Sequence, residues 1–241
     1  MKKLLTLLIL LLITTTSVFA FTDSFNYLKD NESYNTLLKA IKDSDGLTEV
    51  QTYYDIFVEA NPKPVDLARM QYHLVRYYVD TDNKGLAQKH LDLGYELTSS
   101  LTDTLAHDLA YTEMVSADYY LTGKTGTGME SSSLTKALYK QFPDEVAVFL
   151  LEANRTLYSP HIAGGSPKRA IEYFHRLENS GLNLLPVDQF SLDAGLGVGY
   201  SKRNKDTEAK AYLLKAVNLF SGDNSLWKIL RTDYGITKDN L

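Results

Sequence analysis

The chain has 241 residues, of which 44% are hydrophobic and 23% are charged, a composition typical of a folded globular protein rather than a disordered one. It contains no cysteine, which excludes disulfides, thiol nucleophiles, iron–sulfur clusters and cysteine-based zinc sites. Its net charge of −5 argues against a dedicated nucleic-acid-binding protein, because neutralising phosphates requires a basic face.

The first predicted element is an export signal. Lys2 and Lys3 precede the stretch 4–13, in which nine of ten residues are Leu or Ile, and the small residue Ala20 follows a short polar stretch. This is the pattern of a secretory signal peptide, and the apolar run is too short to span a bilayer, which takes about 20 residues. We expect residues 1–20 to be a signal peptide cleaved near Ala20.

The mature chain would be soluble and located in the periplasm or outside the cell, without stable membrane insertion. Phe21 stands where a lipoprotein would need cysteine, so no lipid anchor is expected. Cleavage would remove two lysines and no acidic residue, which leaves a net charge of −7 over 221 residues. A chain of that length buries enough apolar surface to fold without disulfides.

Helical periodicity dominates residues 21–241, because apolar residues recur three and four positions apart and strand-like alternation is rare. The chain contains six prolines, each of which can begin or end a helix. The sequence therefore predicts a single all-α domain made of consecutive helix pairs. The expected pairs are 31–64, 68–101, 102–146, 147–185 and 190–223, followed by one helix at 224–236.

The pair at 102–146 has the least regular pattern, and its register is not determined. One long helix is expected over roughly 103–121, then a loop at 122–128 that contains three glycines, then a short helix. Within this loop Gly123-Lys124-Thr125 looks like the end of a phosphate-binding loop. Asp118 stands where that motif needs glycine, however, and no strand precedes it, so we expect no nucleotide binding.

The pair at 147–185 contains the most unusual loop. Ser166 is a good helix N-cap, and Pro167 suits the first turn of the helix behind it. Two interpretations of Gly164, Gly165 and Ser166 remain open. They form an anion-binding nest at the helix N-terminus, or the glycines only supply positive φ angles.

The pair at 190–223 has the clearest pattern. Small residues stand where two antiparallel helices would approach closely, and large apolar residues stand where the seam between them would be filled. The small residues are Gly197, Ala209 and Ala216, and the large ones are Leu196, Tyr200 and Leu213. This spacing resembles the tetratricopeptide repeat, a helix pair of 34 residues. The same period places Trp227, Leu230 and Tyr234 of the next segment at that family's Trp, Leu and Tyr positions.

The resemblance implies an α-solenoid of antiparallel helix pairs, a superhelix in which residues 224–236 form the C-terminal capping helix. It also implies a concave groove that binds a segment of a protein or peptide partner. At the groove positions, basic residues outnumber acidic ones, so the segment would be acidic. The residues expected to bind it are Lys39, Tyr72, Arg76, Arg155 and Tyr158. Lys and Arg also fit ordinary solvent-exposed helix positions, and that alternative stays open.

No pattern typical of an enzyme or a metal site is present. The five histidines form no His-Glu-x-x-His motif, and no Gly-x-Ser-x-Gly nucleophile elbow occurs. His73, His90 and His107 are spaced by 17 residues, half of the repeat, and are expected to be isolated on helix surfaces. The sequence therefore predicts a non-enzymatic protein-interaction scaffold without cofactor, metal or nucleic-acid partner.

A second hypothesis rests on the loop that contains Gly164 and Gly165. This loop is similar to one in exported tetratricopeptide-like proteins associated with TRAP-type solute transporters. That resemblance implies a small-ligand-binding accessory protein with a pocket near the two glycines, although such proteins are often lipoproteins and this chain lacks cysteine. A continuous groove would favour the scaffold, and a closed pocket would favour the accessory protein.

Overall fold

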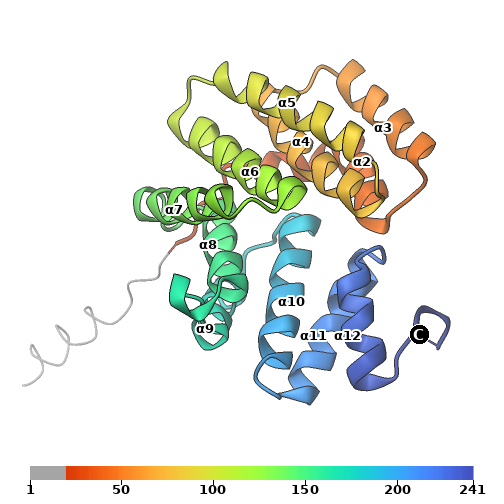
Figure 1. Ribbon diagram of the computed structural model, residues 1–241, viewed down its shortest axis with the longest axis vertical. Helices are drawn as coiled ribbons and strands as arrows, with labels where there is room; N and C mark the ends of the chain where they lie inside the picture. The colour runs from red at the N-terminus through yellow and green to blue at the C-terminus, as the bar shows by residue number, and fades with distance from the viewer. Residues whose placement is uncertain (1–19, 241) are drawn as a thin grey trace, which may run out of the picture.

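The computed structural model describes residues 20–240. Residues 1–19 of the predicted signal peptide lie outside the described residues, so cleavage near Ala20 and export stay predictions. The described chain is all-α, as the periodicity predicted (Figure 1). In these residues the one strand-like feature is an isolated parallel bridge between Thr22 and Glu145.

Eleven α-helices and three short 3-10 helices make up the described part of the chain. In order they are η1 (Asn26–Asp30), α2 (Glu32–Asp43), α3 (Leu47–Glu59), α4 (Pro64–Asp80), α5 (Lys84–Ser99), α6 (Thr104–Thr122), α7 (Thr125–Gln141), α8 (Val146–Tyr158), η2 (His161–Ala163), α9 (Pro167–Glu178), α10 (Pro186–Ser201), α11 (Asp206–Leu219), α12 (Asn224–Tyr234) and η3 (Lys238–Asn240).

Helix starts follow local sequence signals. Pro64, Pro167 and Pro186 each occupy the first turn of a helix, where the missing N–H costs nothing. Ser166 caps α9 by accepting a hydrogen bond from the backbone N–H of Arg169, as its position predicted. The local rules therefore set where α4, α9 and α10 begin.

Neighbouring helices pack against each other in chain order. The most extensive contacts are those of α4 with α5 and of α10 with α11. Helices α2 with α3, α6 with α7, and α8 with α9 also pack, as do α5 with α6 and α9 with α10, while α12 packs on α11. The first helices of several successive pairs also touch, namely α2 with α4, α4 with α6, and α8 with α10. Helices α4 and α10 begin four residues before the predicted starts of their pairs at 68 and 190.

The predicted loop at 122–128 was wrong over most of its length. Only Gly123 and Lys124 separate α6 from α7, and Thr125 to Gly128 form the first turn of α7. Gly128 has a packing reason to be glycine, since a Cβ there would lie 2.8 Å from the ring of Tyr119. Here the close approach of a neighbouring helix, rather than a turn, explains the glycine.

Close helix packing in the C-terminal half also depends on glycine. A Cβ on Gly197 would lie 2.7 Å from Cγ of Leu213, and Ala209 and Ala216 are fully buried on the same side of α11. The predicted close approach at Gly197 is therefore confirmed. A Cβ on Gly195, on another face of α10, would lie 2.2 Å from the ring of Phe174 in α9.

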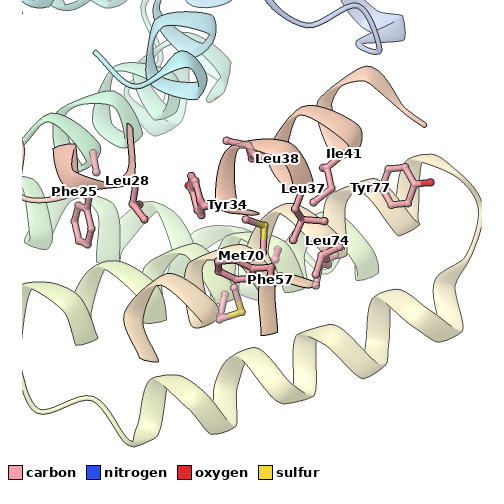
Figure 2. Close-up of a cluster of buried hydrophobic side chains, with 14 of the residues drawn as sticks. Phe25, Leu28, Tyr34, Leu37, Leu38, Ile41, Phe57, Met70, Leu74 and Tyr77 are labelled. Atoms are coloured by element: carbon pink, nitrogen blue, oxygen red, sulfur yellow. The ribbon is translucent and has the colours of Figure 1, made fainter. Parts of the chain in front are cut away.

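Two hydrophobic clusters form the core. The first joins η1 and helices α2 to α6 with residues of α7 and α8, and Figure 2 shows Leu37 and Leu74 within it. The second is built mainly from α8 to α11. The segment before η1 belongs to both clusters, because Phe25 lies in the first and Phe21 in the second, where its ring meets that of Phe149 at 4.8 Å.

The first and last helix pairs touch each other. The loop between α11 and α12 reaches the end of α2, where the N–H of Gly222 donates to the carbonyl of Lys42 at 3.1 Å. The Asp43 carboxylate accepts a further bond from the N–H of Ser221 at 2.6 Å. These contacts join residues almost 180 positions apart, so the row of helices closes on itself.

Candidate functional site

A group of cationic, aromatic and acidic side chains from six helices forms the candidate site. Helices α2, α4, α6, α8 and α10 contribute from their C-terminal half or C-cap, and α12 contributes its N-cap. We call this group the Arg76 cluster. Its members are Lys42, Tyr72, His73, Arg76, Asp80, Tyr120, Tyr158, Lys202 and Asp223. Helix C-termini carry partial negative charge, which suits the cations at this end.

Arg76 lies close to two tyrosine rings. Its guanidinium lies 4.4 Å from the ring centroid of Tyr120 and 5.5 Å from that of Tyr72, and Nη1 donates to the Tyr72 hydroxyl at 3.3 Å. Among the described residues no carboxylate lies within ion-pair distance of it. The stacking fixes the plane of a guanidinium whose charge has no direct counterion.

Lys42 on α2 is the second cation. Its ammonium lies 5.7 Å from the ring centroid of Phe190 and makes no hydrogen bond or ion pair with any described residue. Burial, together with the charge of Arg76, lowers the pKa of Lys42 to about 8, although Asp223 and Asp80 act in the opposite direction. Lys42 and Arg76 therefore lie near each other in a partly desolvated environment.

His73 lies one turn before Arg76 on α4 and is only 8% exposed. Its Nδ1 is buried and has no hydrogen-bond partner among the described residues. Burial and the charges of Lys42, Arg69 and Arg76 hold the pKa of His73 well below its usual value, so the ring is neutral at pH 7. A buried polar nitrogen without a partner is uncommon and marks a place suited to an additional ligand group.

Tyr158 and Lys202 complete the cluster. The Lys202 ammonium lies 5.0 Å from the ring centroid of Tyr158 and donates to the carbonyl of Leu157 at 3.0 Å. Tyr158 is 57% exposed. Partial burial and the charge of Asp223 nevertheless raise its pKa to about 12, with Arg76 acting against them. The Tyr158 ring therefore offers an accessible aromatic surface, and its hydroxyl stays protonated at neutral pH.

The structure brings together three of the five residues predicted to bind a partner, Tyr72, Arg76 and Tyr158. Lys39 instead pairs with Asp43 one turn later and leaves 66% of its side chain exposed. The predicted set missed Tyr120 because the register of the pair at 102–146 was not determined.

Arg155, also in the predicted set, pairs with Glu152 at 2.6 Å, and both side chains are almost fully buried. Its Nη1 also donates to the carbonyl of Ala163 at 3.4 Å, which ties it to the loop before α9. The acidic residue three positions earlier was the sequence signal for this role.

The amide groups of the Gly164–Gly165 loop are already in use. The N–H groups of Gly164 and Gly165 donate to the carbonyls of His161 and Pro160, and that of Ser166 donates to the carbonyl of Thr156. Gly164 has a φ of +88°, and a Cβ on Gly165 would lie 1.8 Å from a carbonyl oxygen. The glycines therefore build a tight turn, and these three amides are not free to hold an anion.

A separate polar group lies near the N-terminal ends of α4 and α10. Arg69 and Glu113 form a buried ion pair at 3.0 Å. Asp188 lies close to them, and its burial raises its pKa to about 7, against the opposing effect of Arg69. The further carboxylates Asp23 and Glu145 act in the same direction as burial. This group is a structural network with an excess of acidic side chains.

Two open clefts of the described residues lie away from Gly164 and Gly165. The larger, about 730 Å³, lies between η1, α2 and α3 and is lined by Tyr27, Tyr53 and Ile56 among others. The smaller is lined by residues of the N-terminal segment and of the α7–α8 connection. Within residues 20–240 no group of three or more potential metal ligands gathers, and no helix has the length and apolar character needed to cross a membrane.

Comparison with known proteins identified no relative of this chain. No protein-family model matches the chain, and the searches of curated proteins and of solved structures gave no significant match.

Proposed function

We propose that this protein is an exported helical-repeat scaffold that binds an acidic segment of a partner protein at the Arg76 cluster. In this proposal the helix pairs form a tetratricopeptide-like α-solenoid of antiparallel hairpins, and α12 caps it. The order of helix packing and the contacts between first helices of successive pairs support that architecture. The glycine-dependent approach of α10 and α11 supports it as well.

The observation that carries the proposal is the environment of Arg76. Its guanidinium is fixed in orientation by Tyr72 and Tyr120, and in the described chain it lacks a carboxylate partner. A buried or partly buried arginine normally pairs with an acid, as Arg69 and Arg155 do here. Arg76 is the exception, so we assign its missing counterion to a partner.

Binding of short fluorescein-labelled peptides to the purified mature protein tests this function. We expect a Glu-rich peptide to bind, in a salt-dependent way, and a Lys-rich or Gly/Ser-rich peptide of equal length not to bind. Arg76→Gln should weaken binding by about tenfold or more, because a charge-assisted hydrogen bond is lost. Fluorescence anisotropy gives the dissociation constants.

The matched control is Arg203→Gln, which makes the same charge change at an exposed position between α10 and α11. It should change affinity by less than about twofold, since exposed charges contribute little. Equal binding of the three peptides, or equal effects of the two substitutions, would contradict the proposal.

A further inference from the structure

Lys42 and Arg76 both present unused donors to solvent. No described residue accepts from the Lys42 ammonium, or from Nε and Nη2 of Arg76. Yet none of these atoms is among the buried side-chain atoms that lack a partner, so solvent reaches them. The two residues come from α2 and α4, which pack directly on each other. Two cationic groups with unused donors therefore lie on adjacent helices and keep partial contact with solvent.

The acidic residues of the Arg76 cluster are already engaged. Asp80 accepts the hydroxyl hydrogen bond of Tyr120. Asp223 accepts from the backbone N–H groups of Ser225 and Leu226 and so caps α12. Neither carboxylate pairs directly with Lys42 or Arg76, although both lie near enough to act on Lys42 and Asp80 also acts on Arg76. The cations are consequently left for an acid from outside the chain.

The orientation of Arg76 selects the geometry of that acid. Tyr120 covers one face of the guanidinium and Tyr72 occupies Nη1, which leaves the edge formed by Nε and Nη2. This edge matches the two oxygens of one carboxylate. A lysine ammonium is a point charge that can bond to either oxygen, and the unpartnered Nδ1 of His73 lies among the same charges.

We propose that Lys42 and Arg76 hold one carboxylate of the ligand between them, as a two-point anchor within the Arg76 cluster. The inference rests on the function proposed above and deepens it, because it names the group recognised and adds Lys42 as a binding residue. If one carboxylate bridges the two cations, the contribution of each cation to binding depends on the other. Two cations that act separately would contribute independently.

Binding at this anchor is linked to a proton. Lys42 is partly neutral above pH 8, because its pKa is about 8 in the free protein. A bound carboxylate favours the charged ammonium, so the protein takes up a proton on binding and affinity falls between pH 7 and 9. The groups that act on Lys42 or lie against it are Arg76, His73 and Asp80 on α4, Asp223 before α12 and Phe190 on α10. Arg76 stays charged and His73 stays neutral between pH 7 and 9, because the pKa of Arg76 is raised and that of His73 is lowered.

A double-mutant cycle on the Glu-rich peptide tests the shared carboxylate. We expect Lys42→Met and Arg76→Gln each to weaken binding about tenfold or more, and the double variant to be only slightly weaker than the worse single variant. Losses that multiply would overturn the two-point anchor. Lys39→Met, on the same helix but paired with Asp43, is the control and should change little.

Two further measurements test the role of the Lys42 charge and the choice of a carboxylate. Lys42→Arg should keep the affinity and abolish its loss between pH 7 and 9, because arginine stays charged. Acetate should displace the peptide at lower concentration than inorganic phosphate, and the reverse order would overturn the choice of carboxylate. If the unmodified protein binds no acidic peptide, the proposed function fails. If the unmodified protein binds the peptide, and Arg76→Gln weakens binding while Lys42→Met does not, the proposed function stands and the two-point anchor is wrong.

Discussion

Asp188 shows how a single buried side chain couples the stability of this protein to pH. Its folded-state pKa of about 7 lies well above the value near 3.8 expected in the unfolded chain. The folded protein therefore binds the proton more tightly than the unfolded one. The stabilisation by protonated Asp188 is complete below pH 4 and is lost as the pH rises through about 7. Near neutral pH this residue destabilises the fold.

Replacing Asp188 by Asn removes that dependence. Asn keeps the shape and carries no charge, so Asp188→Asn should raise the free energy of unfolding by roughly 1–3 kcal/mol at pH 8 and by much less at pH 5. Urea unfolding at the two pH values measures both numbers. Asp233→Asn, at an exposed position on α12, is the control. A gain of equal size at both pH values would show that the charge of Asp188 is not the cause.

Helix α10 shows how one element meets two neighbours at different faces. Gly197 lets α10 approach α11 at Leu213, and Gly195 lets it approach α9 at Phe174. Glycine normally weakens a helix relative to alanine by about 0.5–1 kcal/mol. Here the loss in helix propensity is offset by burial of Leu213 and Phe174, both fully buried. Close helix packing therefore requires glycine at these two positions, although alanine would favour the helix itself.

Gly197→Ala should consequently destabilise the protein, although alanine favours helices. The new Cβ would lie 2.9 Å from the backbone N of Leu213 as well as against its side chain, so two helix backbones must separate. We expect a loss of about 1–3 kcal/mol in the free energy of unfolding, measured with urea. Gly126→Ala, at an open position in α7, should leave stability unchanged or raise it by less than about 1 kcal/mol.

At the scale of the whole molecule, contacts between distant segments hold the two ends of the helix row together. The turn Ser221–Gly222 lies on the end of α2, and the segment before η1 joins both hydrophobic clusters. Lys42 belongs both to the closing contact, through its carbonyl, and to the Arg76 cluster, through its ammonium. The proposed binding site therefore depends on closure.

Gly222→Ala tests that dependence. A Cβ at Gly222 would lie 2.4 Å from the carbonyl oxygen of Lys42 and 2.5 Å from the carbonyl carbon of Asp43, both backbone atoms that cannot rotate away. We expect a lower free energy of unfolding and, in small-angle scattering, a larger radius of gyration as the ends part. Peptide affinity should fall as well. Ser221→Ala removes one weak hydroxyl contact and should leave all three quantities near their original values. An unchanged radius would show that closure does not rest on this turn.

Much of the fold was predictable because helix-forming signals are local. Apolar spacing indicated the helical class, prolines at positions 64, 167 and 186 marked three helix starts, and Gly197 marked a close helix contact. The prediction of a loop at 122–128 was wrong because three glycines close together are also typical of a flexible turn. Gly128 instead accommodates Tyr119.

The candidate site was only partly predictable. Tyr72 and Arg76 share one helix face, four residues apart, and the sequence placed them together. Arg155 had an acidic neighbour at position 152, three residues earlier, which the sequence did show and which now explains its role. Tyr120 lies 40 residues from its partner Asp80, and no periodicity could relate the two.

By itself, the sequence determined the helical class, which faces of most helices are apolar and where several of them begin, because these depend on neighbours within a few residues. Only the tertiary structure decided that Lys42, Arg76, Tyr120 and Tyr158 share one site and that the first and last pairs touch. Such convergence depends on the angles between six packed helices, and those angles are set by side chains far apart in the chain.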